Sequence, residues 1–268
     1  MSKKMIDNEL FAPNFGAVDI MNSQTQRLVV MFLIDISRSV ERYKDILHDS
    51  MIKMRQSLYN DDITRVSTEV GIMLFNTKRE TVLPIREIYN QQDNDYDLEL
   101  ECKGRTHTGE AVMEAVSAIE DRSQMLRKAG KHQYVPVLVL ITDGNPNFAS
   151  CAEKQGRDTL EKAYSTISDK VRNKELQVIV MGIGDRCDEA VLQKLAGGNV
   201  GNKPLKITDA SKLASYFDFI SKSVGSASHG NGVLNNDDFE ELYEEDDDDE
   251  YDFFENYGDL DDINTEGD

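Results

Sequence analysis

The sequence predicts an α/β protein with a doubly wound, mostly parallel sheet, helices on both faces and one short antiparallel strand at an edge. Seven apolar residues run without interruption from Leu28 to Ile34, as is typical of a strand covered on both faces. Two further apolar runs, 135–141 and 176–183, are rich in valine and isoleucine. Segments with helical spacing separate these runs, and strands that alternate with helices pair in parallel through crossover connections.

The first half of the predicted domain contains a helix and an antiparallel pair of strands. Apolar residues recur at helical spacing over about 40–60, so one face of this helix should lie on the sheet. Residues 66–75 alternate as in a strand, and 81–85 form a second, short strand. The brief connection at 76–79 favours antiparallel pairing. Pro84 favours an edge position for the second strand, because proline has no backbone donor.

The second half of the domain alternates helices and strands, which extends the parallel sheet. The polar stretch at 90–99 is expected to be a loop. The remaining predicted elements are, in order, helix 109–126, strand 135–141, helix 153–172, strand 176–183, helix 188–196, strand 205–207 and helix 210–224.

Composition divides the chain into four regions. These are an N-terminal extension at 1–27, the folded domain at 28–224, a flexible linker at 225–234 and an acidic tail at 235–268. The tail holds 18 of the 50 acidic residues and none of the 30 lysines and arginines. A run of like charges repels itself, so we expect a disordered tail. Aromatic residues interleaved with the acids also suit a segment that folds onto a partner, and solubilising and docking roles both stay open.

Charge and cysteine usage exclude several classes of function. The body is near neutral and the whole chain carries a formal net charge of −20, which argues against nucleic-acid binding. No secretory signal and no transmembrane run is visible. Cys102, Cys151 and Cys187 lie far apart without a C-x-x-C pair. We therefore expect a cytoplasmic protein with reduced thiols that does not act at a membrane.

Oxygen-bearing side chains follow the ends of two predicted strands. Asp35, Ser37 and Ser39 come directly after the first strand, spaced two apart, so in an extended segment they point the same way. Asp143 follows a later strand, and Thr106 lies between the two, just before a helix. Ligands bind beyond the carboxyl ends of the strands in such sheets, so we expect these five residues to meet at one edge.

Two carboxylates and three hydroxyls make an oxygen-only set of metal ligands. Such a set with few charges suits Mg²⁺, which prefers oxygen and usually keeps some waters, and Mn²⁺ and Ca²⁺ stay open as alternatives. Each aspartate on its own is also compatible with a helix N-cap. His107, beside Thr106, is expected to make structural hydrogen bonds rather than act as a base.

This constellation resembles the metal-ion-dependent adhesion site of the von Willebrand factor type A domain. The family pattern is D-x-S-x-S, then a threonine, then an aspartate in T-D-G. Here these are Asp35-Ile36-Ser37-Arg38-Ser39, Thr106 and Thr142-Asp143-Gly144, and the resemblance covers about 28–224. It implies that the five oxygen-bearing residues hold a divalent cation, and that an Asp or Glu of a protein partner completes the coordination of that cation.

Within that family the sequence looks closest to bacterial single-domain proteins associated with tellurium resistance. The similarity rests on the segments 137–146, 180–185 and 216–223. Arg38 and Val40 depart from that group, in which glycine and methionine are usual. The metal positions are unaffected, but Arg38 places a cation at the rim of the site.

The resemblance implies binding rather than catalysis. The expected protein is a cytoplasmic, metal-dependent module that captures a partner's carboxylate, in a stress or tellurium-resistance type of system. Its own acidic tail would add contacts or occupy the open metal position. One alternative is a Mg²⁺-dependent phosphohydrolase, but the dehalogenase-type pattern needs an acid where Ser37 stands. Another alternative is a scaffold that acts through the tail, with an inert metal site.

Overall fold

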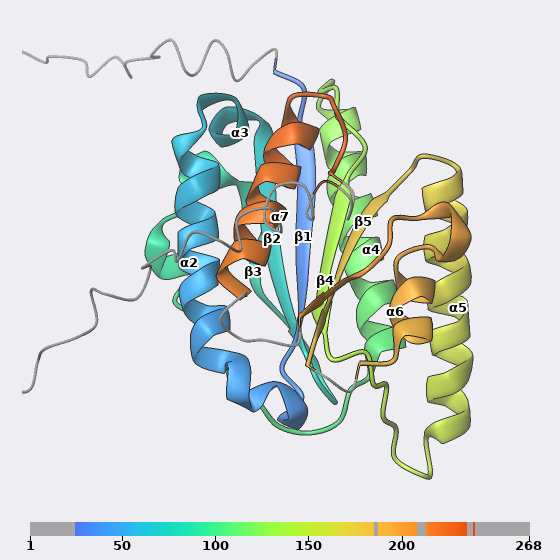
Figure 1. Cartoon of the computed structure of the whole chain (residues 1–268). Coiled ribbons are helices and arrows are strands. Elements are labelled where there is room, and N and C mark those ends of the chain that lie inside the picture. The colour runs from blue at the N-terminus through green and yellow to red at the C-terminus, as the bar shows by residue number, and fades with distance from the viewer. Residues whose placement is uncertain (1–24, 185–186, 208–212, 235–237, 239–268) are drawn as a thin grey trace, which may run out of the picture.

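The computed structural model describes residues 25–184, 187–207, 213–234 and 238, and it places a six-stranded sheet between layers of helices (Figure 1). The strands are β1 (Leu28–Asp35), β2 (Thr68–Phe75), β3 (Arg79–Glu87), β4 (Val137–Thr142), β5 (Gln177–Ile183) and β6 (Leu205–Ile207). The α-helices are α2 (Lys44–Asn60), α3 (Asp62–Ser67), α4 (Thr108–Lys128), α5 (Glu153–Arg172), α6 (Glu189–Leu195) and α7 (Leu213–Ser228). Short 3₁₀ turns are η1 (Arg38–Tyr43), η2 (Ile88–Asn90), η3 (Asp93–Asp95) and η4 (Gly198–Val200).

The strand order β3-β2-β1-β4-β5-β6 creates a switch point beside β1. After β1 the chain builds β2 and β3 on one side, and it then crosses over to build β4, β5 and β6 on the other. All neighbouring strands pair in parallel except β2 and β3. Where the order of a doubly wound sheet reverses in this way, the loops beyond the two strands diverge and leave a crevice for a ligand. That position lies between the carboxyl ends of β1 and β4.

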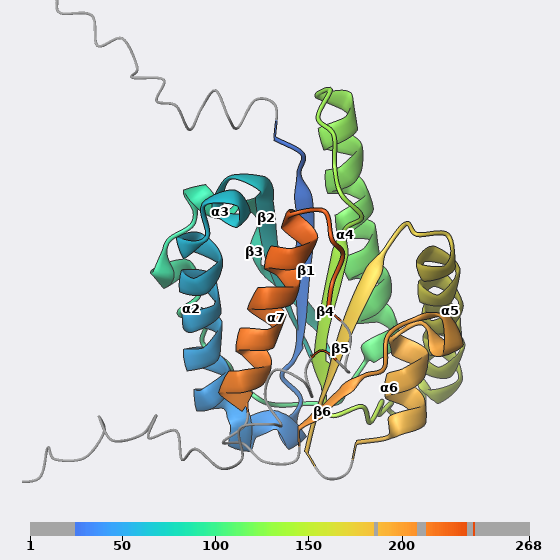
Figure 2. The same cartoon turned by 45° about the horizontal axis from the view of Figure 1, so that its top comes forward.

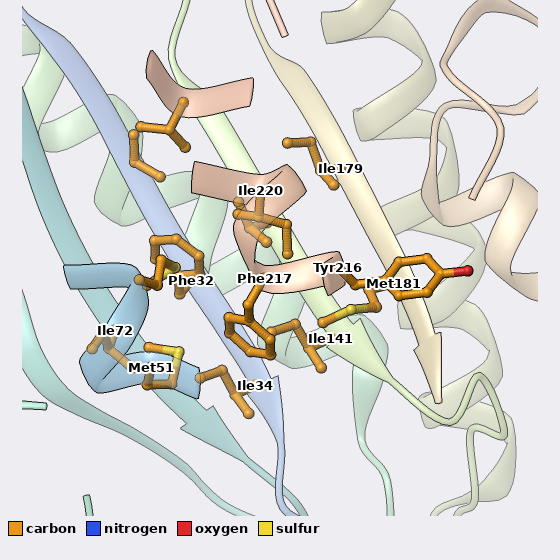
Figure 3. Close-up of a cluster of buried hydrophobic side chains, with 14 of the residues drawn as sticks. Phe32, Ile34, Met51, Ile72, Ile141, Ile179, Met181, Tyr216, Phe217 and Ile220 are labelled. Atoms are coloured by element: carbon orange, nitrogen blue, oxygen red, sulfur yellow. The ribbon is translucent and has the colours of Figure 1, made fainter. Parts of the chain in front are cut away.

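Helices cover both faces of the sheet, which is why β1 is apolar throughout. α2, α3 and α7 lie on one face, and α4, α5 and α6 lie on the other (Figures 1 and 2). Alternate side chains of β1 enter the two separate cores: Phe32 and Ile34 enter the first, and Met31 and Leu33 enter the second. In the first core, Phe217 and Ile220 of α7 pack over the sheet, as Figure 3 shows.

The predicted fold class is confirmed, with differences in individual elements. The antiparallel edge strand is present and contains Pro84, but β3 has nine residues rather than five. The residues at the two ends of β3 show little alternation between polar and apolar types, because much of the strand is exposed. The sequence pattern therefore does not reveal them as part of the strand. The predicted helix at 40–60 begins as the 3₁₀ turn η1. The helix α3 was not predicted, because six residues show no apolar period; Asp61 caps it by accepting the Thr64 N–H at 2.7 Å.

The ends of the folded domain differ from the predicted boundaries. A flexible linker over 225–234 is wrong for its first four residues, because α7 continues to Ser228 and buries Val224 and Ala227 on one face. Val233 then donates its N–H to the Gln177 side chain at 2.9 Å. At the other end, the domain begins before Leu28, since the buried Arg27 pairs with Glu87 at 2.6 Å.

Several predictions lie outside the described residues or concern simple properties. The extension at 1–24, the start of the last helix at 210–212 and the acidic tail from 239 onward are not among the described residues. All three cysteines are free thiols. In the parts of the chain that are described, no helix has the length and apolarity that a membrane span requires.

Candidate metal centre

Asp35 ends β1 and is completely buried at the switch point. Its carboxylate accepts two hydrogen bonds: Oδ1 from the backbone N–H of Ser37 at 2.8 Å, and Oδ2 from the Thr142 hydroxyl at 2.7 Å. The sheet register explains the second contact. Ile34 is paired with Ile141, so the next residues along, Asp35 and Thr142, lie side by side at the ends of β1 and β4.

Ser37 and Ser39 follow Asp35 in a tight turn. Ser37 keeps an extended backbone, and η1 begins at the next residue. The turn brings the two serine hydroxyls to 3.1 Å from each other, with Ser37 buried and Ser39 exposed to solvent. A turn, rather than the extended segment that was expected, therefore brings these side chains together. Of the two hydroxyls, that of Ser37 lies on the buried side of the turn and that of Ser39 on the solvent side.

Thr106 lies in a loop held against the neighbouring strand ends. Its carbonyl accepts the N–H of Asn147 at 3.0 Å, which ties it to the segment that follows Asp143. The Thr106 residue is 3% exposed. Gly104, two residues earlier, has φ +81°, and a Cβ there would lie 2.7 Å from the Thr77 hydroxyl oxygen. Glycine thus allows this loop to pack closely against the end of β2.

Asp143 follows β4 and is 8% exposed. Its Oδ1 accepts the backbone N–H of Asn145 at 3.1 Å, and the Asn145 side chain donates to the Asp143 carbonyl at 3.0 Å. The helix-cap alternative fails for both aspartates. The helical elements that follow them, η1 and α5, have Ser37 and Ala152 at their N-cap positions.

The structure brings the five predicted residues to one edge of the sheet on three connected loops. Besides the bond from Asn147 to Thr106, the N–H of Lys103 donates to the Ile36 carbonyl at 2.9 Å. This second bond ties the loop of Thr106 to the loop of Ser37. Main-chain hydrogen bonds therefore fix the three loops relative to one another, so the side chains they carry are positioned before any ligand arrives.

Burial and a neighbouring negative charge make the ionised form of Asp35 unfavourable. Burial raises the pKa of Asp35 to about 6, and the negative charge of Asp143 adds to this rise. The hydrogen bonds from Thr142 and Ser37 act in the opposite direction but do not compensate for burial. A cation between the two carboxylates would remove this penalty, so the pair fits a bound positive charge.

The donor set fits a hard divalent cation. Carboxylate and hydroxyl oxygens are ligands of Mg²⁺, Mn²⁺ and Ca²⁺, and neither sulfur nor imidazole belongs to the predicted set. Across the described residues, no group of three or more His, Cys, Asp or Glu side chains is placed to hold a metal. A cation here would thus rely on hydroxyls, water and an incoming ligand besides the two aspartates.

Two features of the site were missed or misjudged from the sequence. The sequence pattern includes Thr142 only as part of T-D-G and predicts no role for it, although its buried hydroxyl donates a hydrogen bond to the Asp35 carboxylate. Its position one residue before Asp143, on the strand beside β1, was the available signal. The expected hydrogen bonds of the His107 ring are also not seen. The ring packs against Phe148 with centroids 5.7 Å apart, and its Nε2 has no partner among the described residues.

Comparisons with known proteins agree with the fold. The solved structures that resemble it include the following three. The D319A mutant of the PilB minor pilin from Streptococcus sanguinis has 15% identity and a TM-score of 0.57, covering 78% of this chain and 64% of that one. The protein BatB from Bacteroides thetaiotaomicron has 18% identity and a TM-score of 0.51, covering 75% and 99%. Proximal thread matrix protein 1 from the mussel byssus, with a zinc-occupied MIDAS motif, has 15% identity and a TM-score of 0.52, covering 75% and 48%.

These identities show a shared fold and nothing finer. The chain spans about half the length of the mussel protein and 64% of the pilin. No curated protein sequence matches the chain. A family model does match: that of the von Willebrand factor type A domain, over residues 30–219, which include all five residues of the candidate centre. The chain therefore belongs to the von Willebrand factor type A domain family.

Proposed function

We propose that this protein is a metal-dependent protein-binding module. Domains of this family with the metal-site motif typically mediate metal-dependent protein–protein interactions. In the proposal, Asp35, Ser37, Ser39, Thr106 and Asp143 hold a divalent cation, Mg²⁺ in the first instance. A protein partner then supplies an aspartate or glutamate to the cation. A cytoplasmic location and a role in a stress or tellurium-resistance type of system remain predictions from the sequence.

The observation that carries the proposal is the pairing of two carboxylates with hydroxyls at the switch point. Asp35 is buried and its pKa is raised, so its negative charge beside that of Asp143 is electrostatically unfavourable. A cation held mostly by neutral hydroxyls would keep a strong attraction for an anionic ligand. Ser39 is exposed, so one side of the site is open to solvent and to an incoming side chain.

The same arrangement gives little support to the phosphohydrolase alternative. General acid catalysis needs a group that can donate a proton near neutral pH. Position 37 carries a hydroxyl, which is a poor proton donor near neutral pH, and this hydroxyl lies 3.1 Å from that of Ser39. Family members are generally interaction modules rather than enzymes, which favours binding.

Mn²⁺ titration of the full chain tests the proposal. Bound Mn²⁺ with an open coordination position relaxes water protons strongly, and a peptide carrying one glutamate among glycines and serines should displace that water and reduce the effect. Asp35→Asn and Asp143→Asn should each weaken Mn²⁺ binding at least tenfold. Asp158→Asn, an exposed aspartate on α5, is the control and should bind Mn²⁺ like the wild type.

Two results would count against the proposal. One is Mn²⁺ affinity that stays within twofold of wild type in both site variants, with circular dichroism showing that they fold. The other is capture of the glutamate peptide that persists in EDTA.

A further inference from the structure

Three arginines surround the candidate metal centre, and we infer that they make its ligand a polyacidic segment, namely the Asp246–Asp249 run of this chain's own tail. This inference rests on the proposed function, since it names the ligand of the same site. Arg38, Arg42 and Arg105 are called the arginine collar below, and all three are exposed.

The contacts of the collar place it at the edge of the sheet where the metal centre lies. Arg38 stands between the two serines of the D-x-S-x-S segment. Arg105 directly precedes Thr106, and its Nη1 donates to the Asn147 side chain at 2.7 Å and to the Phe148 carbonyl at 3.1 Å. Both acceptors lie just after Asp143 in the chain, so Arg105 bridges two of the three loops.

Arg42 completes the collar on the side of β5. Its guanidinium lies 4.7 Å from the centre of the Tyr43 ring. A Cβ added to Gly184, the residue after β5, would lie 3.2 Å from Arg42 Nη2. Arg42 therefore packs against the backbone where the next parallel strand ends.

None of the three arginines of the collar forms an ion pair with a carboxylate of the described residues. The acceptors of Arg105 are neutral, and neither Arg38 nor Arg42 forms an ion pair within the described parts of the chain. Two nearby acidic groups have other partners: Glu101 pairs with Lys103, and the Asp188 carboxylate caps α6. Glu41, in the same 3₁₀ turn as Arg38 and Arg42, is exposed to solvent and forms no ion pair with either arginine in the described parts of the chain. A ligand that offers one carboxylate to the metal thus meets three further cations, which favours a ligand with several acidic residues.

The reach of the tail selects its aspartate run. Leu234 lies at the opposite edge of the sheet, where the Asn202 side chain donates to its carbonyl and Val233 contacts Gln177 at the start of β5. The eight residues of β1 span roughly 26 Å. Asp246–Asp249 begin twelve residues beyond Leu234, an extended reach of about 40 Å, whereas Glu240 reaches only about 20 Å. The aspartate run is therefore long enough to pass the sheet and meet the collar, with one carboxylate on the metal and the others on arginines.

Attachment to the same chain makes this contact competitive. A ligand on the same chain competes intramolecularly, and a short connection gives a local concentration on the order of millimolar. The tail would hold the site closed against weaker ligands, and a partner with a stronger acidic segment would displace it. The exposed arginines also make the contact sensitive to salt, because exposed charges are screened at physiological ionic strength.

Fluorescence anisotropy with a labelled peptide of residues 240–250 tests the inference on the full chain in Mg²⁺. The first comparison is between wild type and a tail-neutral variant that combines Asp246→Asn, Asp247→Asn, Asp248→Asn and Asp249→Asn. The tail-neutral variant should bind the peptide at least tenfold more tightly, because its own tail no longer competes. Equal binding by the two proteins would overturn the inference. Competition that depends on protein concentration would also overturn it, because a second copy would then be the occupant.

The second comparison uses collar variants in the tail-neutral protein. Arg38→Gln and Arg105→Gln should each weaken peptide binding about three- to tenfold, and they should flatten its dependence on salt. Arg38→Gln should not weaken Mn²⁺ binding, because loss of a neighbouring positive charge favours a bound cation. Arg172→Gln, an exposed arginine at the end of α5, is the matched control and should stay within twofold. Collar variants that behave like this control would overturn the inference.

The two proposals fail in different ways. If the protein captures the single-glutamate peptide in a Mg²⁺-dependent way, and the collar variants bind the peptides as well as wild type, the proposed function stands and the inference is overturned. Peptide binding that survives EDTA and Asp143→Asn, yet weakens in the collar variants, supports the collar and overturns the metal-dependent function.

Discussion

The Thr142 hydroxyl donates a 2.7 Å hydrogen bond to the carboxylate of Asp35, across 107 residues of sequence and between adjacent strands. Both side chains are fully buried. The bond holds the first aspartate of the site in place from the strand that delivers the second one, Asp143. The pairing of β1 with β4 therefore positions both carboxylates together.

Thr142→Val should damage both stability and metal binding. The substitution keeps the shape of the side chain but leaves a buried carboxylate oxygen without its donor, which should cost about 1–3 kcal/mol of unfolding free energy. Mn²⁺ affinity should fall roughly tenfold, as is typical when a partner of a metal ligand is lost. Thr68→Val is the matched control, since the Thr68 hydroxyl is buried without a hydrogen-bond partner in the described structure, and it should be neutral. Equal effects of the two changes in urea denaturation would contradict this role of Thr142.

The stability of the metal-free protein should depend on pH through Asp35. Its pKa rises from 3.8 to about 6 on folding, so between these values the folded state holds a proton that the unfolded state has lost. The contribution of Asp35 to stability is present below about pH 4 and falls as the pH rises to about 6, by up to about 3 kcal/mol. Urea denaturation in EDTA at pH 4.5, 5.5 and 7 would measure this. The difference between wild type and Asp35→Asn isolates the contribution of Asp35, and a difference that does not change with pH would refute the prediction.

Metal affinity should show the opposite trend with pH. A cation needs the ionised carboxylate, so binding below pH 6 must first remove the proton from Asp35. Affinity for Mn²⁺ should fall about tenfold per pH unit below 6 and level off above it. Calorimetry at pH 5, 6 and 7 in buffers of different ionisation enthalpy should also detect proton release at pH 5. An affinity that is flat across this range would show that Asp35 is not part of the binding group.

Two helix glycines should respond to alanine in opposite ways. A Cβ on Gly109 would lie 2.6 Å from the backbone nitrogen of Leu160, so Gly109→Ala should push α4 away from α5 and cost about 1–3 kcal/mol. Gly225 lies inside α7, and the nearest atom to its added Cβ is 3.8 Å away. Gly225→Ala should therefore stabilise the protein by about 0.5–1 kcal/mol, through helix propensity. Thermal unfolding measures both, and no gain at Gly225 would favour the flexible linker originally expected there.

The sequence predicted most of what the hydrophobic pattern controls directly. Leu28–Ile34 is apolar at every position because both faces of β1 are covered, and this made the central strand and its terminal Asp35 easy to find. The rule that the carboxyl ends of parallel strands share one edge then predicted that Asp35, Thr106 and Asp143 lie near one another. These features depend on local pattern and on general rules of chain topology.

Features that depend on contacts between distant segments were harder to predict. The role of Thr142 needs the register between β1 and β4, which no local pattern gives. Arg27 was assigned to an extension because its ion pair with Glu87 spans 60 residues. The glycines and serines after Val224 are typical of a linker, but the packing of α7 on the sheet outweighs their low helix propensity.

The two ends of the folded domain lie at the edge of the sheet away from the metal centre. Arg27 pairs with Gln133, just before β4, and Val233 contacts Gln177 at the start of β5. A fluorescent protein, a surface anchor or a second domain joined before residue 25 or after residue 234 would thus be attached at the base of the molecule. Fusions and immobilised forms that replace residues 1–24 or 235–268 at these two positions should keep the attached group away from the rim, so both positions suit the building of sensors or affinity supports from this domain.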